Sequence, residues 1–170
     1  MTEVKFQELA DRLNISFKNM TLIKQAFIHR SYLNETKIKT FSNERLEFLG
    51  DSILSFLVWE YLYKKYPEFT EGELTNLRSS IVKTATLAQA AKELNLGNFL
   101  LLSRGEEESG GRENNSLLAD TFEAFLGSVF LDSGLPSVQK ILKNLLFPLL
   151  TKILEDKLYK DAKSNFQELI

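Results

Sequence analysis

The stretch from residue 43 to residue 66 constrains the fold more than any other part of the sequence, because it combines a nearly continuous apolar run with regularly spaced acids. At about 100° per residue, the acidic and small polar positions fall on one narrow stripe of a helix, and Leu, Ile, Val, Phe and Trp cover the rest of the circumference. The stripe consists of Glu44, Glu47, Asp51 and Ser55. We therefore expect a largely buried helix with a single acidic line.

The acids of this line repel one another. Two carboxylates about 5.5 Å apart, at an effective dielectric constant of roughly 20, interact unfavourably by on the order of 3 kcal/mol before any relaxation. A bound divalent cation would offset this repulsion, and so would water on the solvated face of an amphipathic helix. One helix considered alone leaves both interpretations open.

A second apolar segment, residues 116–133, repeats the pattern. Its polar exceptions also share one stripe, at spacings of four, three and four residues: Ser116, Asp120, Glu123 and Gly127. The glycine would let another backbone approach this helix closely. We expect the two acidic stripes to face a common cleft, with Glu44 near its edge and four carboxylates converging in it: Glu47, Asp51, Asp120 and Glu123.

Helical periodicity covers most of the remaining chain, and no segment shows the alternation of a β-strand. Residues 103–115, rich in Glu and Gly, are expected to form a loop. The other expected helices are one over residues 3–14, one capped by Asn19 and ending near His29, one that begins at the capping box Thr70–Glu73, a short one closed by Asn95 and Gly97, and a last one kinked by Pro148. The predicted fold class is all-α, in one domain.

The amino-acid composition excludes several kinds of metal site. The chain has no cysteine and a single histidine, His29, which excludes disulfide frameworks and leaves too few ligands for thiolate or histidine-rich zinc sites. Carboxylates without such partners match the oxygen-ligand preference of Mg²⁺ or Mn²⁺, ions that can activate water and stabilise charge on a phosphoryl oxygen. Spacing alone leaves a structural cation or solvated acids as alternatives. His29 is either a ligand or base, or a hydrogen-bonded structural residue at a helix end.

Charge and hydropathy limit the partners. The formal net charge of −2 gives no overall basic footprint for nucleic acid. No uncharged stretch approaches the roughly 18 residues that a membrane span needs, and the N-terminus lacks the pattern of a secretory signal. We expect a cytoplasmic protein with neither a membrane partner nor a small-molecule substrate.

Residues 43–54, NERLEFLGDSIL, closely resemble the signature of the ribonuclease III family, endonucleases that cut double-stranded RNA. The resemblance covers nearly the whole chain, because further segments are similar to the family in the family order. These are HRSY at 29–32, EGELTNLRSSIV at 71–82, GEEESGGRENNSLLADTFEAFLGSVFLDSG at 105–134 and DAKSNFQEL at 161–169.

The resemblance implies specific roles for the acids. It assigns Mg²⁺ coordination, with Mn²⁺ as a substitute, to Glu47, Asp120 and Glu123, and an essential catalytic role to Asp51 and Glu123. It makes Glu44 and Glu71 accessory acids for substrate or dimer contacts. It also implies a homodimer in which Phe48 projects into the partner, whereas packing of Phe48 in its own core is the alternative from the residues alone.

The resemblance also implies a reaction. Each site of the dimer would cut one strand of an RNA duplex, leaving 5′-phosphate and 3′-hydroxyl ends, in the processing of ribosomal precursor and some messenger RNAs. A catalytically silent RNA-binding or ribosome-associated scaffold is the alternative, and such a relative would be expected to lose carboxylates from the stripes.

Domain organisation follows from the same resemblance. Residues 1–156 are expected to form the catalytic domain, and residues 157–170 the start of a linker. In bacterial members of the family a double-stranded-RNA-binding domain follows this linker, and the sequence stops before it. We therefore expect the chain to bind duplex RNA weakly.

Overall fold

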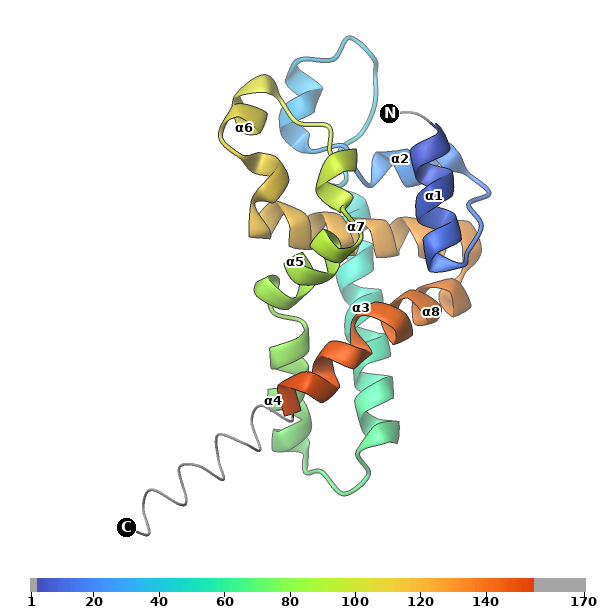
Figure 1. The fold of residues 1–170 in the computed structure, drawn as a ribbon, viewed down its shortest axis with the longest axis vertical. Helices are drawn as coiled ribbons and strands as arrows, with labels where there is room; N and C mark the ends of the chain where they lie inside the picture. Colours follow the sequence, from blue (N-terminus) through green and yellow to red (C-terminus); the bar gives the residue numbers. More distant parts are fainter. Residues whose placement is uncertain (1–2, 155–170) are drawn as a thin grey trace.

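A computed structural model describes residues 3–154 of the chain (Figure 1). Its α-helices are α1 (Glu3–Leu13), α2 (Met20–Gln25), α3 (Glu44–Lys65), α4 (Glu71–Ile81), α5 (Thr84–Glu93), α6 (Arg104–Glu108), α7 (Asn115–Ser133) and α8 (Leu135–Leu145). Three 3₁₀ turns join them: η1 (Arg30–Asn34), η2 (Leu96–Phe99) and η3 (Gly111–Glu113). Within residues 3–154 there is no β-strand, only an isolated parallel bridge between Ile28 and Leu101. The all-α prediction is confirmed.

Helix α7 is the centre of the fold. It runs across the middle of the molecule, α3 passes it at a steep angle, and α5 packs beside it (Figure 1). From Leu118 to Val129 nearly every side chain of α7 is buried, the acids of its stripe excepted. Aromatic rings fill the space between α7 and the N-terminal helices, where Phe27 lies between Phe99 and Phe125 with ring centroids 5.2 and 6.0 Å away.

The crossing of α3 and α7 has no side-chain layer between the two backbones. A Cβ atom added to Gly50 of α3 would overlap the carbonyl oxygen of Glu123, and one added to Gly127 of α7 would overlap the carbonyl oxygen of Leu46. The close approach predicted at Gly127 is therefore found, with Gly50 as its counterpart. This contact turns both acidic stripes toward the same side of the crossing.

Several predicted helix ends are found. The Glu73 N–H donates to Thr70 Oγ1 at 3.3 Å and the Thr70 N–H donates to the Glu73 carboxylate at 2.7 Å, which completes the capping box of α4. Asn19 caps α2 through the Leu22 N–H. Helix α3 ends at Lys65, two residues before Pro67.

Other expectations about local structure were wrong. Residues 103–115 contain α6 and η3 instead of an irregular loop, because Ser103 caps α6 and the Arg112 guanidinium donates to the carbonyls of Gly97 and Leu100. Helix α2 ends at Gln25, earlier than expected. By contrast, the interruption of the last helix that was predicted near Pro148 is found: the helix breaks at Leu146, and helical residues resume at 147. The break precedes Pro148, which has no N–H to donate to the preceding turn.

The closing of α5 agrees with the expectation at Asn95 and differs from it at Gly97. Asn95 follows the helix in the left-handed conformation, with a φ of 56°, whereas Gly97 lies in η2 and packs against the backbone of Arg112. No helix within residues 3–154 is long and apolar enough to cross a membrane. The predicted linker, residues 157–170, and the boundary at residue 156 lie outside the described residues.

Candidate metal centre

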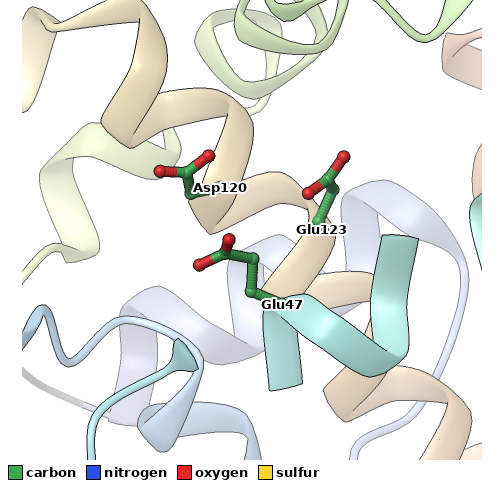
Figure 2. A group of neighbouring side chains, drawn as sticks. All are labelled: Glu47, Asp120 and Glu123. Carbon is green, nitrogen blue, oxygen red and sulfur yellow. The ribbon is translucent and has the colours of Figure 1, made fainter. Parts of the chain in front are cut away.

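Three carboxylates meet where α3 and α7 cross. Glu47 comes from α3, and Asp120 and Glu123 come from α7; all three are half-buried and lie next to one another (Figure 2). One carboxylate oxygen of each residue lies within 4.8 Å of the corresponding oxygens of the other two. The structure thus brings together three of the four acids that were predicted to converge, at spacings that one cation can bridge.

Burial raises the pKa values of all three clustered acids, and the charges of neighbouring acids add to the effect at Glu47 and Glu123. Burial, reinforced by the negative charges of Asp51, Asp120 and Glu47, raises the pKa of Glu123 from 4.5 to about 8. Burial also raises the pKa of Glu47, with the charge of Asp120 as the next cause. Without a cation the three carboxylates therefore bind protons more readily than carboxylates in water, which is the expected signature of converging acids.

Asp120 and Glu47 each have a basic neighbour that partly opposes this effect. Burial raises the pKa of Asp120, and the ring of His29 lowers it in part. Arg30 likewise lowers the pKa of Glu47 in part. His29 directly precedes η1 and Arg30 is its first residue, and both line the cleft beside Glu47 and Asp120.

Asp51 lies outside the group of three. It follows Glu47 by one helical turn on the same stripe, its side chain is exposed, and its charge acts on both Glu47 and Glu123. The stripe ends one turn later at Ser55, which accepts a hydrogen bond of 2.9 Å from Arg78. Asp51 therefore lies on the solvent side of the cluster, at its edge.

The two predicted accessory acids lie in different places. Glu44 is exposed in the first turn of α3, accepts a hydrogen bond of 2.7 Å from Ser42 and lies 3.8 Å from the Arg30 guanidinium. It borders the same cleft as Glu47 and Asp120. Glu71 is exposed at the start of α4 and is not among the acids gathered at the crossing.

Phe48 points away from the core. Its side chain is 77% exposed, so the alternative in which it packs into its own core is wrong. It belongs to a row of exposed apolar side chains at helical spacing along α3, which we call the apolar stripe: Phe48, Phe56, Trp59 and Tyr63. An exposed row of this kind marks an interaction surface.

Sequence reasoning missed part of the site. A cleft of about 320 Å³ opens beside the cluster, lined by His29, Arg30, Asn43, Glu44, Glu47, Leu117 and Asp120. Asn43 is 4% exposed, its side-chain amide donates to the Ala26 carbonyl at 3.3 Å, and its N–H donates to the Ile28 carbonyl at 2.8 Å. It therefore ties the start of α3 to the segment that carries His29. A polar residue before an apolar helix is usually a cap, and the sequence gives no sign of this tie.

Comparisons with known proteins agree with this geometry. A sequence model described as "Ribonuclease-III-like" matches residues 19–150. The chain is 48% identical to "Ribonuclease 3" of Bacillus cytotoxicus, over 97% of this chain and 67% of that protein. It is 43% identical to "Ribonuclease 3" of Caldanaerobacter subterraneus subsp. tengcongensis, over 95% of this chain and 71% of that protein.

Solved structures have the same fold. A crystal structure of the nuclease domain of ribonuclease III from Campylobacter jejuni matches with a TM-score of 0.76 and 38% identity, over 86% of this chain and 95% of that chain. Dicer from Pichia stipitis matches with a TM-score of 0.58 and 31% identity, over 79% of this chain and 57% of that chain. With a family match over residues 19–150 and close relatives along nearly its whole length, the chain belongs to the ribonuclease III family.

Proposed function

We propose that this chain hydrolyses phosphodiester bonds in double-stranded RNA with the help of a divalent cation held at the crossing of α3 and α7. The observation that carries the proposal is the cluster of Glu47, Asp120 and Glu123, whose oxygens lie within 4.8 Å of one another. Membership of the ribonuclease III family supports the reaction, because the chain's relatives are named as ribonucleases.

The ligand set fits Mg²⁺, with Mn²⁺ as a substitute. Both ions prefer hard oxygen donors, and Mg²⁺ keeps several of its waters, which a half-buried site beside an open cleft permits. The raised pKa values of Glu47, Asp120 and Glu123 fit as well, since a bound cation would remove the repulsion among them. When bound, such an ion lowers the pKa of a coordinated water and stabilises charge on the phosphoryl group.

Each acid of the site has its own role in this proposal. Glu47 of α3 and Asp120 of α7 would hold the ion, and Glu123, whose pKa is raised to about 8, would supply both a ligand and an acid–base group. Asp51, exposed at the edge of the cluster, is placed to accept a hydrogen bond from water that enters from solvent. Glu44 borders the cleft and Glu71 begins α4, and we propose that both contact the substrate or a partner.

We propose that the active form is a homodimer. The apolar stripe of α3 supports this, because Phe48 and Tyr63 are each 77% exposed. A related C. jejuni structure, with a TM-score of 0.75 and 39% identity, is described as showing flexibility in a region involved in dimer formation. In the proposed dimer Phe48 packs on the partner, and two sites cut the two strands to leave 5′-phosphate and 3′-hydroxyl ends.

Three finer points remain proposals: ribosomal precursor and some messenger RNAs as targets, a cytoplasmic location, and a catalytic domain that ends near residue 156. A catalytically silent scaffold is disfavoured, because the acids of both stripes are present and three of them converge.

Cleavage of a hairpin RNA in Mg²⁺ tests the proposal. We expect Asp51→Asn and Glu123→Gln to lower the cleavage rate by at least about 100-fold, in the range seen when a single catalytic group is removed. Glu8→Gln, an exposed acid on α1, is the matched control and should cut at the parental rate. If both site variants cut as fast as the parent, the assigned roles are wrong.

A further inference from the structure

We propose that Arg30 binds a phosphate group of the RNA strand that enters the cleft beside the candidate metal centre. The inference rests on the proposed function and adds a substrate contact outside the carboxylate cluster. Arg30 lines the cleft of about 320 Å³ together with Glu47 and Asp120, two of the three acids that would hold the cation. A phosphate that reaches a cation on these acids therefore enters the cleft that Arg30 borders.

The acids of the site oppose the binding of a phosphate. Glu47, Asp120 and Glu123, when ionised, carry one negative charge more than a divalent cation neutralises, and Glu44 adds another at the rim of the cleft. An RNA phosphate would therefore meet residual negative charge even with the cation bound, and a further positive group would favour its binding. Of the described residues that line the cleft, Arg30 is the one lysine or arginine.

The backbone on both sides of Arg30 is fixed to another part of the chain. The N–H of His29, the preceding residue, donates to the Leu101 carbonyl at 3.1 Å. The hydroxyl of Ser31, the following residue, accepts a hydrogen bond of 2.9 Å from the Ser103 N–H and lies 2.8 Å from Nδ1 of His29. The arginine is therefore presented to the cleft from a fixed backbone position.

The guanidinium itself is held only weakly. Within residues 3–154 its one ion pair is with Glu44, at 3.8 Å, and the two side chains are 72% and 55% exposed. An exposed pair at this distance contributes little to stability. Glu44 also accepts a hydrogen bond of 2.7 Å from Ser42, so it keeps a partner when the arginine moves. Exchange of Glu44 for a phosphate therefore costs little, and the guanidinium can donate two parallel hydrogen bonds to the phosphate oxygens.

Steady-state cleavage of a hairpin RNA in Mg²⁺ by the whole 170-residue chain tests the inference. We expect Arg30→Gln to lower kcat/KM by about 10-fold, as expected when a hydrogen-bonded charged partner is lost. Its kcat/KM should also fall less steeply with KCl concentration than that of the parent, because one phosphate contact fewer releases counterions. A variant with the kcat/KM and the salt dependence of the parent would overturn the inference.

Two variants serve as controls. Arg30→Lys keeps the positive charge and loses the planar fork, so it should retain the parental salt dependence and recover only part of kcat/KM. Lys5→Gln removes one positive charge from an exposed position on α1, outside the cleft, and should cut like the parent. The thermal unfolding midpoint in chelator shows whether each variant folds like the parent.

Doubly substituted chains distinguish a phosphate contact from a simple partner of Glu44. If Arg30 served only to neutralise Glu44, Arg30→Gln would have no effect in a Glu44→Gln background. We expect the loss of kcat/KM to persist in that background, since the phosphate contact does not require Glu44. Disappearance of the loss there would overturn the inference.

Cation binding, measured by calorimetry, separates the arginine from the metal centre. Arg30→Gln removes a positive charge from the rim of the cleft, so its affinity for Mg²⁺ should equal or exceed that of the parent. Excess Mg²⁺ should then leave the cleavage defect in place. Recovery of the parental kcat/KM in excess Mg²⁺ would overturn the inference, because Arg30 would then act on the cation instead of the RNA.

The inference and the proposed function can fail separately. A parent chain that neither binds a cation nor cuts RNA contradicts the proposed function. A parent that does both, while Arg30→Gln cuts as the parent does at every salt concentration, overturns the inference alone.

Discussion

At the scale of single residues, Glu123 has the most unusual environment in the described chain. It is half-buried beside three other acids, and its pKa is raised to about 8. Near neutral pH and without a cation, much of this carboxyl group is therefore protonated. A cation that binds the cluster must displace that proton, so cation affinity should rise with pH.

This gives a prediction for stability. Because the pKa of Glu123 is about 8 in the folded chain against 4.5 in the unfolded chain, its contribution to stability is fully present below pH 4.5 and is lost as the pH rises through 8. The raised pKa values of Glu47 and Asp120 act in the same direction. Urea denaturation in chelator should therefore show that the free energy of unfolding of the parent falls between these two pH values.

Glu123→Gln supplies the comparison, since the amide cannot ionise and the variant should show a flatter pH profile than the parent. Saturating Mg²⁺ should reverse the parental trend, because the ion binds the ionised carboxylates. A parent whose stability in chelator does not fall across this range would contradict the convergence of charges at the crossing.

At the scale of elements, the contact between α3 and α7 sets the geometry of the site. We expect Gly50→Ala to destabilise the chain by roughly 1–3 kcal/mol or more, because the added methyl group would overlap the Glu123 carbonyl and push the helices apart. RNA cleavage should fall further than stability alone explains, since Glu47 would move away from Asp120. Denaturation and cleavage assays measure the two effects.

Gly72→Ala is the matched control for this substitution. Gly72 also lies in a helix, α4, but a Cβ added there meets nothing within 4 Å. Replacing it should be neutral or should stabilise the chain by up to about 1 kcal/mol through helix propensity. Equal effects of the two substitutions would show that the crossing tolerates a side chain.

The sequence was most informative where apolar periodicity ran over many residues. The acidic lines of α3 and α7 could be assigned from spacing, because a helix places residues three and four apart on one face. Helix α6 could not, because its five residues carry no apolar period and depend on the Ser103 cap. The position of α6 also depends on Arg112, which donates hydrogen bonds to carbonyls 12 and 15 residues earlier in the chain.

The same limit applies to the site. Gly127 predicted a close approach of another backbone. The sequence could not predict that this backbone would be the one at Gly50, because that depends on how the two helices cross. The carboxylate cluster was predicted as four acids, and the structure places Asp51 at its edge. The cleft wall formed by His29 and Asn43 depends on long-range hydrogen bonds and was not foreseen.

At the scale of the whole molecule, the apolar stripe of α3 predicts association. We expect Phe48→Asp to shift the chain from dimer toward monomer, because a charge would replace an aromatic ring in the interface core. Sedimentation at several concentrations measures this. Val4→Asp, on α1 and also exposed, should leave the assembly unchanged. A parent chain that sediments as a monomer at all concentrations would contradict the proposed dimer.

The net charge of the whole chain predicts weak RNA binding. Because a formal net charge of −2 gives the 170-residue chain no overall basic footprint, we expect it to neutralise few phosphates and to release few counterions from a duplex. We expect a dissociation constant in the micromolar range or weaker at physiological salt, measured by fluorescence anisotropy with a long duplex and a non-cleaving Glu123→Gln variant. Submicromolar binding would contradict this expectation.

The contact between Gly50 and Gly127 has a further consequence for how the protein can change over evolutionary time. Because main chain meets main chain at the crossing, the distance between the ligand-bearing turns is set by atoms that every residue type shares. A substitution elsewhere in the core changes the packing around the two helices but not the atoms that are in contact at the crossing. We therefore expect the spacing of the three acids to be more sensitive to substitution at Gly50 and Gly127 than to substitution elsewhere in the core.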